Sequence, residues 1–425
     1  MGHRSEADTV PPWTRFGDPG TIVAMTTEPV NIALEAAGED DIPAMAALWA
    51  EAFPEKPVER RDRELREGLA FGDLSDCWTV KSEGRIAGAL RTYRLTMNLW
   101  GRALPTMGLA GVAVAPDFRR RGIGRRMCIE ALKLARARGD VVCALYPFRT
   151  AFYRELGFVL AGELHRYRFE PAELAMYPGW DRVVRAPETG KDQARDIYAR
   201  VAGSTNGLIE RTERMWSFVD RPGTYLYLHR NPRGVPTGYI VVRGKGGTPE
   251  TSRLRVLELV ADDREAYLGL LGWLSVQRDQ WGRILYDALP GEYFHRRLSH
   301  PRTAASTMTR GLWFHSASIL RGPMFRVLDV AKIIGPEGTG VEPPRGTPFG
   351  WHEPLQVRDP HLPDNQGRWE NGVQVDTKLS TAGDVLSIGE VTTLFFEGRL
   401  PGQVPPPSDW TPNLGLRDIR LFDEF

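Results

Sequence analysis

Cysteine is scarce in this chain of 425 residues: Cys77, Cys128 and Cys143 are the only three, and they are scattered. The sequence contains no CxxC pair, no HExxH motif and no alternating Cys/His tract, so it predicts no zinc site and no other bound metal. Three is also an odd and small number for a disulfide scaffold. A reducing, cytoplasmic location is therefore the simplest expectation.

Excess charge of one sign and long apolar runs are missing as well. The 55 basic and 54 acidic side chains leave a net charge of +1, which removes the general electrostatic basis for nucleic-acid binding. No apolar run approaches the roughly 18–20 residues of a membrane span. Residues 1–27 lack the charged start and apolar core of a signal peptide. We expect a disordered leader there; the alternative is an over-long start, with Met25 as the true initiator.

Glycine and proline are plentiful, with 44 and 32 residues, and apolar residues make up 42% of the chain. This composition is typical of folded domains with many turns. At roughly 150 residues per domain, the length predicts about three domains. We expect them at 28–175, 176–318 and 319–425.

The range 28–175 has the pattern of a mixed α/β unit. Helices are predicted after Gly38, over about 60–69, from Gly124 to Gly139 and over 150–156. Strands are predicted over 77–81, 86–95, 107–114, 141–145 and 158–169.

The range 176–318 repeats part of this plan: a strand at 254–260, a helix at 265–280 and a strand at 283–289. This similarity predicts a duplicated fold. The basic, glycine-containing turn of the first copy is replaced by Asp262 and Asp263, two carboxylates that would repel a phosphate and that we interpret as helix caps. In 319–425, the segments 381–386 and 388–396 fit either two helices or a helix and a strand.

The sharpest signal is the segment 112–124, V-A-V-A-P-D-F-R-R-R-G-I-G. A strand, a tight basic turn and a helix follow one another here. The N–H groups of a helix N-terminus and its dipole bind anions, glycine permits close approach, and arginine adds charge. The segment therefore predicts a phosphate-binding loop; the alternative is a basic surface turn that contains two glycines.

A second signal is the segment 151–158, A-F-Y-R-E-L-G-F. A phenol with a pKa of about 10 can protonate a departing thiolate, so Tyr153 is a candidate general acid. The alternative is a core aromatic on an amphipathic helix. For Cys128, which lies on the helix after the phosphate loop, core packing is favoured over a nucleophilic role.

These two motifs, R-x-x-G-x-G after a V-A-V strand and the later F-Y-x-x-x-G-F, resemble the GNAT (Gcn5-related N-acetyltransferase) fold. Residues 108–170 resemble the Eis acetyltransferases in particular. The chain also ends in phenylalanine, as the members of that family do. The resemblance implies an α/β (α+β) chain of tandem GNAT folds, each a mixed sheet flanked by helices, followed by a sterol-carrier-like α+β domain. It also implies that the second GNAT-like domain is degenerate and that the chain forms a homo-oligomer, a hexamer in this family.

Site residues carried over from the family fall into four groups. Acetyl-CoA would be held along its pantetheine arm by Val112, Ala113 and Val114, and around its pyrophosphate by Arg120, Arg121, Gly122, Ile123, Gly124 and Arg125. Phe148 and Arg149 would flank the cofactor. Tyr153 would be the proton donor, and the terminal carboxylate of Phe425 the proton acceptor. Glu55 and Glu424 would contact the amine substrate.

Two of these positions depart from the family. Gly124 stands where several members have a bulky aliphatic residue, and Phe148 replaces a small polar residue that could bond the cofactor. The resemblance implies an acetyl-CoA-dependent N-acetyltransferase that acts on primary amines of small polyamines, such as aminoglycosides, or on Lys side chains. The alternatives are another tandem-GNAT acyltransferase of the mycothiol-synthase kind, and a non-catalytic lipid- or partner-binding protein that uses the sterol-carrier-like domain.

Overall fold

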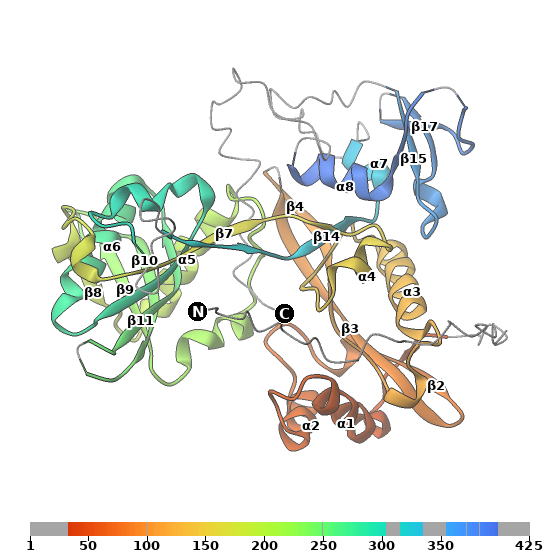
Figure 1. Ribbon diagram of the computed structural model, residues 1–425, viewed down its shortest axis with the longest axis horizontal. Helices are drawn as coiled ribbons and strands as arrows, with labels where there is room; N and C mark the ends of the chain where they lie inside the picture. The colour runs from red at the N-terminus through yellow and green to blue at the C-terminus, as the bar shows by residue number, and fades with distance from the viewer. Residues whose placement is uncertain are drawn as a thin grey trace, which may run out of the picture.

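The structure is a computed structural model that describes residues 33–99, 101–248, 250–302, 315–334, 354–370, 372–381 and 383–397. The predicted leader at 1–27, together with Glu424 and Phe425, lies outside the described residues. The described chain contains two seven-stranded sheets and a four-stranded sheet. Figure 1 shows them as three lobes, which we call the first, second and third units in chain order.

The first unit is built on a mixed sheet with helices on both faces. Its strands, in spatial order, are β1 (Glu35–Ala36), β2 (Cys77–Ser82), β3 (Arg85–Leu99), β4 (Arg102–Val114), β5 (Val142–Leu145), β14 (Met324–Val327) and β6 (Val159–Leu160). Ala89 packs against α1 (Ile42–Ala52) and α2 (Val58–Glu67), and its neighbour Leu90 packs against α3 (Ile123–Arg138). Because adjacent strand residues point to opposite faces, these helices cover opposite sides.

The helix predicted after Gly124 is confirmed as α3. Its buried residues recur at helical spacing: Ile123, Met127, Cys128, Ala131, Leu132 and Ala135. It ends at Gly139, which has a φ of 95° and takes the left-handed conformation that glycine adopts readily.

The second unit repeats this architecture, which confirms the predicted duplication. Its strands, in spatial order, are β8 (Val183–Arg185), β9 (Thr224–Arg230), β10 (Pro236–Lys245), β11 (Arg253–Ala261), β12 (Arg283–Ala288), β7 (Glu163–Phe169) and β13 (Ser318–Arg321). Its helices are α5 (Gly190–Ala202) and α6 (Arg264–Ser275). In both sheets the fourth and fifth strands are parallel. The predicted helix over 265–280 is shorter, because a 3-10 turn replaces its last residues.

The two units exchange a strand. β7 follows β6 in the chain yet lies in the second sheet, between β12 and β13, while β14 follows β13 yet lies in the first sheet, between β5 and β6. Figure 1 shows both strands crossing between the lobes. The single strand predicted over 158–169 is therefore wrong, because Gly162, with a φ of 89°, breaks it into two strands in different sheets.

The predicted boundaries 28–175, 176–318 and 319–425 remain predictions. The exchange means that each large sheet contains one strand from outside the continuous range expected for it.

The third unit is a small sheet in the order β17 (Val373–Asp376), β16 (Gly367–Glu370), β15 (Leu355–Arg358) and β18 (Val385–Ser387), followed by α8 (Ile388–Glu397). The open choice over 381–396 is thus a strand and a helix. α8 packs on the first sheet, where the rings of Phe396 and Phe325 stack with centroids 4.5 Å apart. The predicted resemblance of the third unit to a sterol-carrier domain remains a prediction. Across the described residues, no helix is long and apolar enough to cross a bilayer.

Candidate active site

The C-terminal half of β4 has one open edge. β4 pairs with β5 only from Thr106 to Gly108 and then continues to Val114 beside β3 alone. The N–H of Ala115 donates to Ala87 at 2.9 Å on the β3 side. Since successive residues point their peptide groups to alternate edges, Val114 faces the open edge. Its carbonyl there accepts a hydrogen bond from Arg119 Nε at 3.2 Å.

A β-bulge shapes this edge. The β3–β4 register passes from Arg91–Ala110 to Ala89–Ala113, so two residues of β4 face one of β3. One of the two is Gly111, whose φ is 60° and whose carbonyl accepts a bond from Trp49 Nε1 at 2.6 Å. The guanidinium of Arg91 lies 4.1 Å from the Trp49 ring centroid. Trp49 therefore fixes the bulge, which bends β4 and increases its local twist just before the open edge.

The predicted phosphate loop leads from this strand into α3. Gly122, with a φ of 78°, is the N-cap of α3, and no side chain caps the helix. The first bond of the helix is from Arg126 N–H to the Gly122 carbonyl at 3.1 Å, so the N–H groups of the first turn lack backbone partners. A Cβ on Gly122 would meet nothing within 4 Å. The helix end therefore has both the free donors and the space that an anion requires.

Positive side chains surround this helix end. Arg119, Arg120, Arg121 and Arg125 are all exposed. Arg120 has a φ of 64°, and Arg121 lies over the ring of Phe118, 5.4 Å from its centroid. Ile123, also predicted as a loop residue, is buried, so its side chain packs in the core. Only its backbone could contact a ligand.

The equivalent helix end in the second unit is closed. Asp263 is the N-cap of α6, and its carboxylate accepts the N–H of Ala266 at 2.7 Å. Asp262 forms an ion pair with Arg200 at 2.7 Å. The interpretation of Asp263 as a cap is confirmed: the second copy fills its anion position with its own carboxylate.

Tyr153 lies in α4 (Thr150–Arg154) and is 3% exposed. Its ring is surrounded edge-on by Phe148, Phe152 and Phe158, with centroids 5.0–5.8 Å away. This burial raises the pKa of the phenol well above its usual value, so Tyr153 stays protonated at neutral pH. The raised pKa excludes a resting phenolate, so Tyr153 does not act as a base and its hydroxyl is available as a donor.

Phe148 itself is 65% exposed and covers the outer side of Tyr153, and Arg149 beside it is exposed as well. Phe148 therefore contacts Tyr153 from the solvent side, and the cofactor-flanking role of Phe148 and Arg149 remains a prediction. Glu55 is exposed, just after α1. Glu424 and Phe425 lie outside the described residues.

The three cysteines are all free, buried and at most 1% exposed. Burial raises the pKa of Cys128 to about 12 and also raises the pKa of Cys77 and Cys143. The packing role predicted for Cys128 is confirmed, because a protonated, buried thiol is a poor nucleophile. Within the described ranges, no group of His, Cys, Asp and Glu is arranged to hold a metal ion.

Comparison with known proteins agrees with this geometry. Two stretches, residues 33–161 and 207–321, each match a family model described as an acetyltransferase (GNAT) domain. The N-acetyltransferase Eis of Mycobacterium tuberculosis H37Ra is 27% identical in an alignment of 317 residues that covers 68% of this chain and 75% of that protein. The chain carries two GNAT acetyltransferase domains and is a relative of the N-acetyltransferase Eis.

Further relatives of this acetyltransferase include an uncharacterized N-acetyltransferase of Streptomyces avermitilis, 25% identical over 61% of this chain and 72% of that protein. Among solved structures, a GCN5-related N-acetyltransferase from Anabaena variabilis shares the fold with a TM-score of 0.68 and 20% identity, covering 85% of this chain and 89% of that one. Eis1 from Mycobacterium abscessus gives a TM-score of 0.64 and 17% identity, covering 87% and 90%. These structural likenesses confirm the tandem GNAT fold.

Two residues that shape the site of this acetyltransferase, Trp49 and Gly111, are not among the residues predicted from the sequence. Trp49 reads as an ordinary apolar residue of α1, and its indole bond to β4 has no signal in the sequence. Gly111 had a signal, because a glycine inside a strand often marks a bulge.

Proposed function

We propose that the first unit binds acetyl-CoA along the open edge of β4 and transfers its acetyl group to a primary amine. One observation carries the proposal: the open edge and the uncapped end of α3, with Gly122 at its start, follow one another in a single strand–turn–helix. Backbone groups of Val112 and Val114 would hold the pantetheine arm at the open edge, while Ala113 between them pairs with Ala89 of β3. The donors and charges of Arg120, Arg121, Gly122, Ile123, Gly124 and Arg125 would hold the pyrophosphate.

Acetyl-CoA supplies a thioester, and the residues around it need only position the amine and move protons. A backbone N–H at the open edge, near Val112 or Val114, would polarise the thioester carbonyl. The amine nitrogen forms a bond to the carbonyl carbon as the carbon–sulfur bond breaks. The departing sulfur takes the proton of the Tyr153 hydroxyl, which solvent later restores.

The proton of the amine requires an acceptor, and we propose the terminal carboxylate of Phe425. Its reference pKa is about 3.3–3.7, so it is ionised at neutral pH. Support comes from the resemblance to Eis, whose chains also end in phenylalanine. Glu55 and Glu424 would assist by attracting the positively charged amine.

A short polar extension after Phe425 is expected to lower kcat by about 10²-fold or more, the usual loss when a general base is removed. Acetyl-CoA affinity should change little, because the extension leaves the phosphate loop intact. Steady-state kinetics and calorimetry measure the two effects. The same extension at Met1 is the matched control, and full activity with the C-terminal extension would rule out this carboxylate as the base.

Tyr153→Phe is expected to lower kcat by about 10²-fold, because the change removes only the hydroxyl and keeps the ring packed among Phe148, Phe152 and Phe158. The KM for acetyl-CoA should stay within about 2-fold. Phe152→Leu, which disturbs the same packing without touching the hydroxyl, is the control. Wild-type turnover in Tyr153→Phe would make Tyr153 a packing residue only.

For the acceptor we propose small polyamines, aminoglycosides among them, or Lys side chains. Calorimetry with acetyl-CoA, followed by a screen of such amines for CoA release, tests this function. A non-catalytic lipid- or partner-binding protein would bind no acetyl-CoA and release no CoA with any amine. Another tandem-GNAT acyltransferase of the mycothiol-synthase kind would keep a working second unit, and the Asp263 cap on α6 argues against that.

A further inference from the structure

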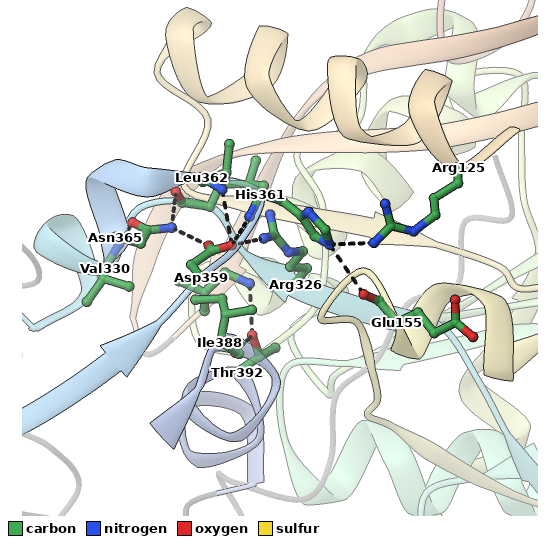
Figure 2. Close-up of polar contacts among 12 residues, drawn as sticks. Arg125, Glu155, Arg326, Val330, Asp359, His361, Leu362, Asn365, Ile388 and Thr392 are labelled. Carbon is green, nitrogen blue, oxygen red and sulfur yellow. Dashed lines mark hydrogen bonds and ion pairs between the residues drawn. The ribbon is translucent and has the colours of Figure 1, made fainter. Parts of the chain in front are cut away.

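We propose that His361, in the third unit, is a positioning residue that holds Arg125 at the phosphate loop of the first unit and so strengthens acetyl-CoA binding. The proposal rests on the proposed function, because it takes Arg125 to contact the pyrophosphate. Figure 2 shows the contact: the guanidinium of Arg125 and the ring of His361 face one another, with Glu155 below.

His361 sits on a rigid base. It follows β15 by three residues, and the carboxylate of Asp359 organises this turn. Asp359 accepts the N–H groups of His361 and Leu362, both at 3.1 Å, and pairs with Arg326 of β14 at 2.7 Å. Both side chains of that ion pair are fully buried. The backbone of His361 is therefore fixed to the first sheet.

The imidazole joins two parts of the candidate active site. His361 Nε2 lies 3.5 Å from Arg125 Nη2, in the first turn of α3, and 3.3 Å from the carbonyl oxygen of Glu155. Glu155 follows α4, two residues after Tyr153. One side chain of the third unit thus touches both the helix that begins at the phosphate loop and the helix that carries the proposed proton donor.

The nitrogen can serve one of its two neighbours at a time. When Nε2 is unprotonated it accepts from Arg125, and when it carries the proton it donates to the Glu155 carbonyl. The charged groups around the ring are Arg125 and Arg326, with Asp359 at the base of the turn. Burial lowers the pKa of His361, so the ring is neutral at neutral pH. Accepting the Arg125 bond requires the neutral tautomer that carries its proton on Nδ1.

The restraint on Arg125 comes from a different unit than those on its neighbours. Arg119 is bonded to the Val114 carbonyl and Arg121 lies over Phe118, both within the first unit, whereas the exposed side chain of Arg125 contacts His361 of the third unit. An arginine that is already ordered loses less conformational freedom when it meets a phosphate. Ordering one long side chain in advance corresponds to about 2- to 10-fold in affinity.

The test is a double-mutant cycle on the full chain with acetyl-CoA as the probe, measured by calorimetry and as KM and kcat. His361→Leu is expected to weaken binding about 2- to 10-fold, with kcat nearly unchanged. Arg125→Ala should weaken it at least as much, and the double variant should be no worse than Arg125→Ala. His361→Gln, whose amide can reach the same position, should restore most of the affinity.

The matched control is His295→Leu in the second unit, which removes a half-buried histidine bonded to Tyr167 at 3.3 Å. It should lower the melting temperature without changing the KM for acetyl-CoA. If the losses of His361→Leu and Arg125→Ala add, or if His361→Leu lowers only the melting temperature, the proposal is overturned. If Arg125→Ala leaves acetyl-CoA affinity unchanged while Gly122→Asp abolishes binding, the proposal for His361 fails and the phosphate-loop assignment survives. If neither variant changes the affinity, the proposed function fails.

Discussion

Gly122→Asp is expected to abolish acetyl-CoA binding while the fold survives. A side chain at Gly122 meets open space, and Asp tolerates the left-handed conformation of the N-cap better than most residues. Its carboxylate would accept the free N–H groups of α3 and repel the pyrophosphate. Like-charge contacts cost several kcal/mol, so a loss of at least about 10²-fold is expected by calorimetry.

The second unit already contains the counterpart of this variant, because Asp263 occupies the same place on α6 and bonds to the first turn. Gly122→Ala is the control: it carries a backbone cost at least as large as that of Asp, without a charge, and should weaken binding far less. Circular dichroism and the melting temperature check that both variants are folded. An unchanged dissociation constant in Gly122→Asp would remove the phosphate loop from the site.

An isolated fragment of residues 28–175 is expected not to fold, although it contains the whole phosphate loop and Tyr153. It lacks β14, whose four residues are all buried, so β5 would lose the partner on one side. It also carries β7 without the strands that flank it. We expect no cooperative unfolding transition by near-ultraviolet circular dichroism.

A longer fragment, residues 28–334, is the control for that experiment. It contains every strand of both large sheets, and it should unfold cooperatively. Its midpoint should fall below that of the full chain, because Arg326 loses Asp359 and a buried charge without its partner costs about 3–5 kcal/mol. A stable, cooperatively folding 28–175 would show that the first sheet does not need β14.

The elements of each unit could be predicted from the sequence because their signals are local. Apolar residues at helical spacing mark α3, and the continuous apolar run at 141–145 marks β5. The strand exchange has no local signal. β7 and β14 are short strands that fit the same slot in two copies of one sheet, so periodicity identifies each strand without identifying its partner.

The candidate site also contains residues that local sequence predicts and contacts that it does not. The glycine loop could be predicted because backbone chemistry at a helix end depends on a few neighbouring residues, with Gly122 at the centre. The contact between Arg125 and His361 could not, since it joins side chains 236 residues apart in the chain. Trp49 likewise acts on Gly111 across 62 residues. Long-range contacts of this kind are set by the packing of the units.

The burial of every cysteine has a practical consequence for assays of this enzyme. A disulfide reagent that turns yellow when it meets a thiol would find Cys77, Cys128 and Cys143 shielded in the folded chain, so the colour would come from released CoA alone. Unfolded molecules would expose all three thiols at once and react with the same reagent. One cuvette can thus report turnover during the reaction and, after the substrates are removed, the unfolded fraction of each variant.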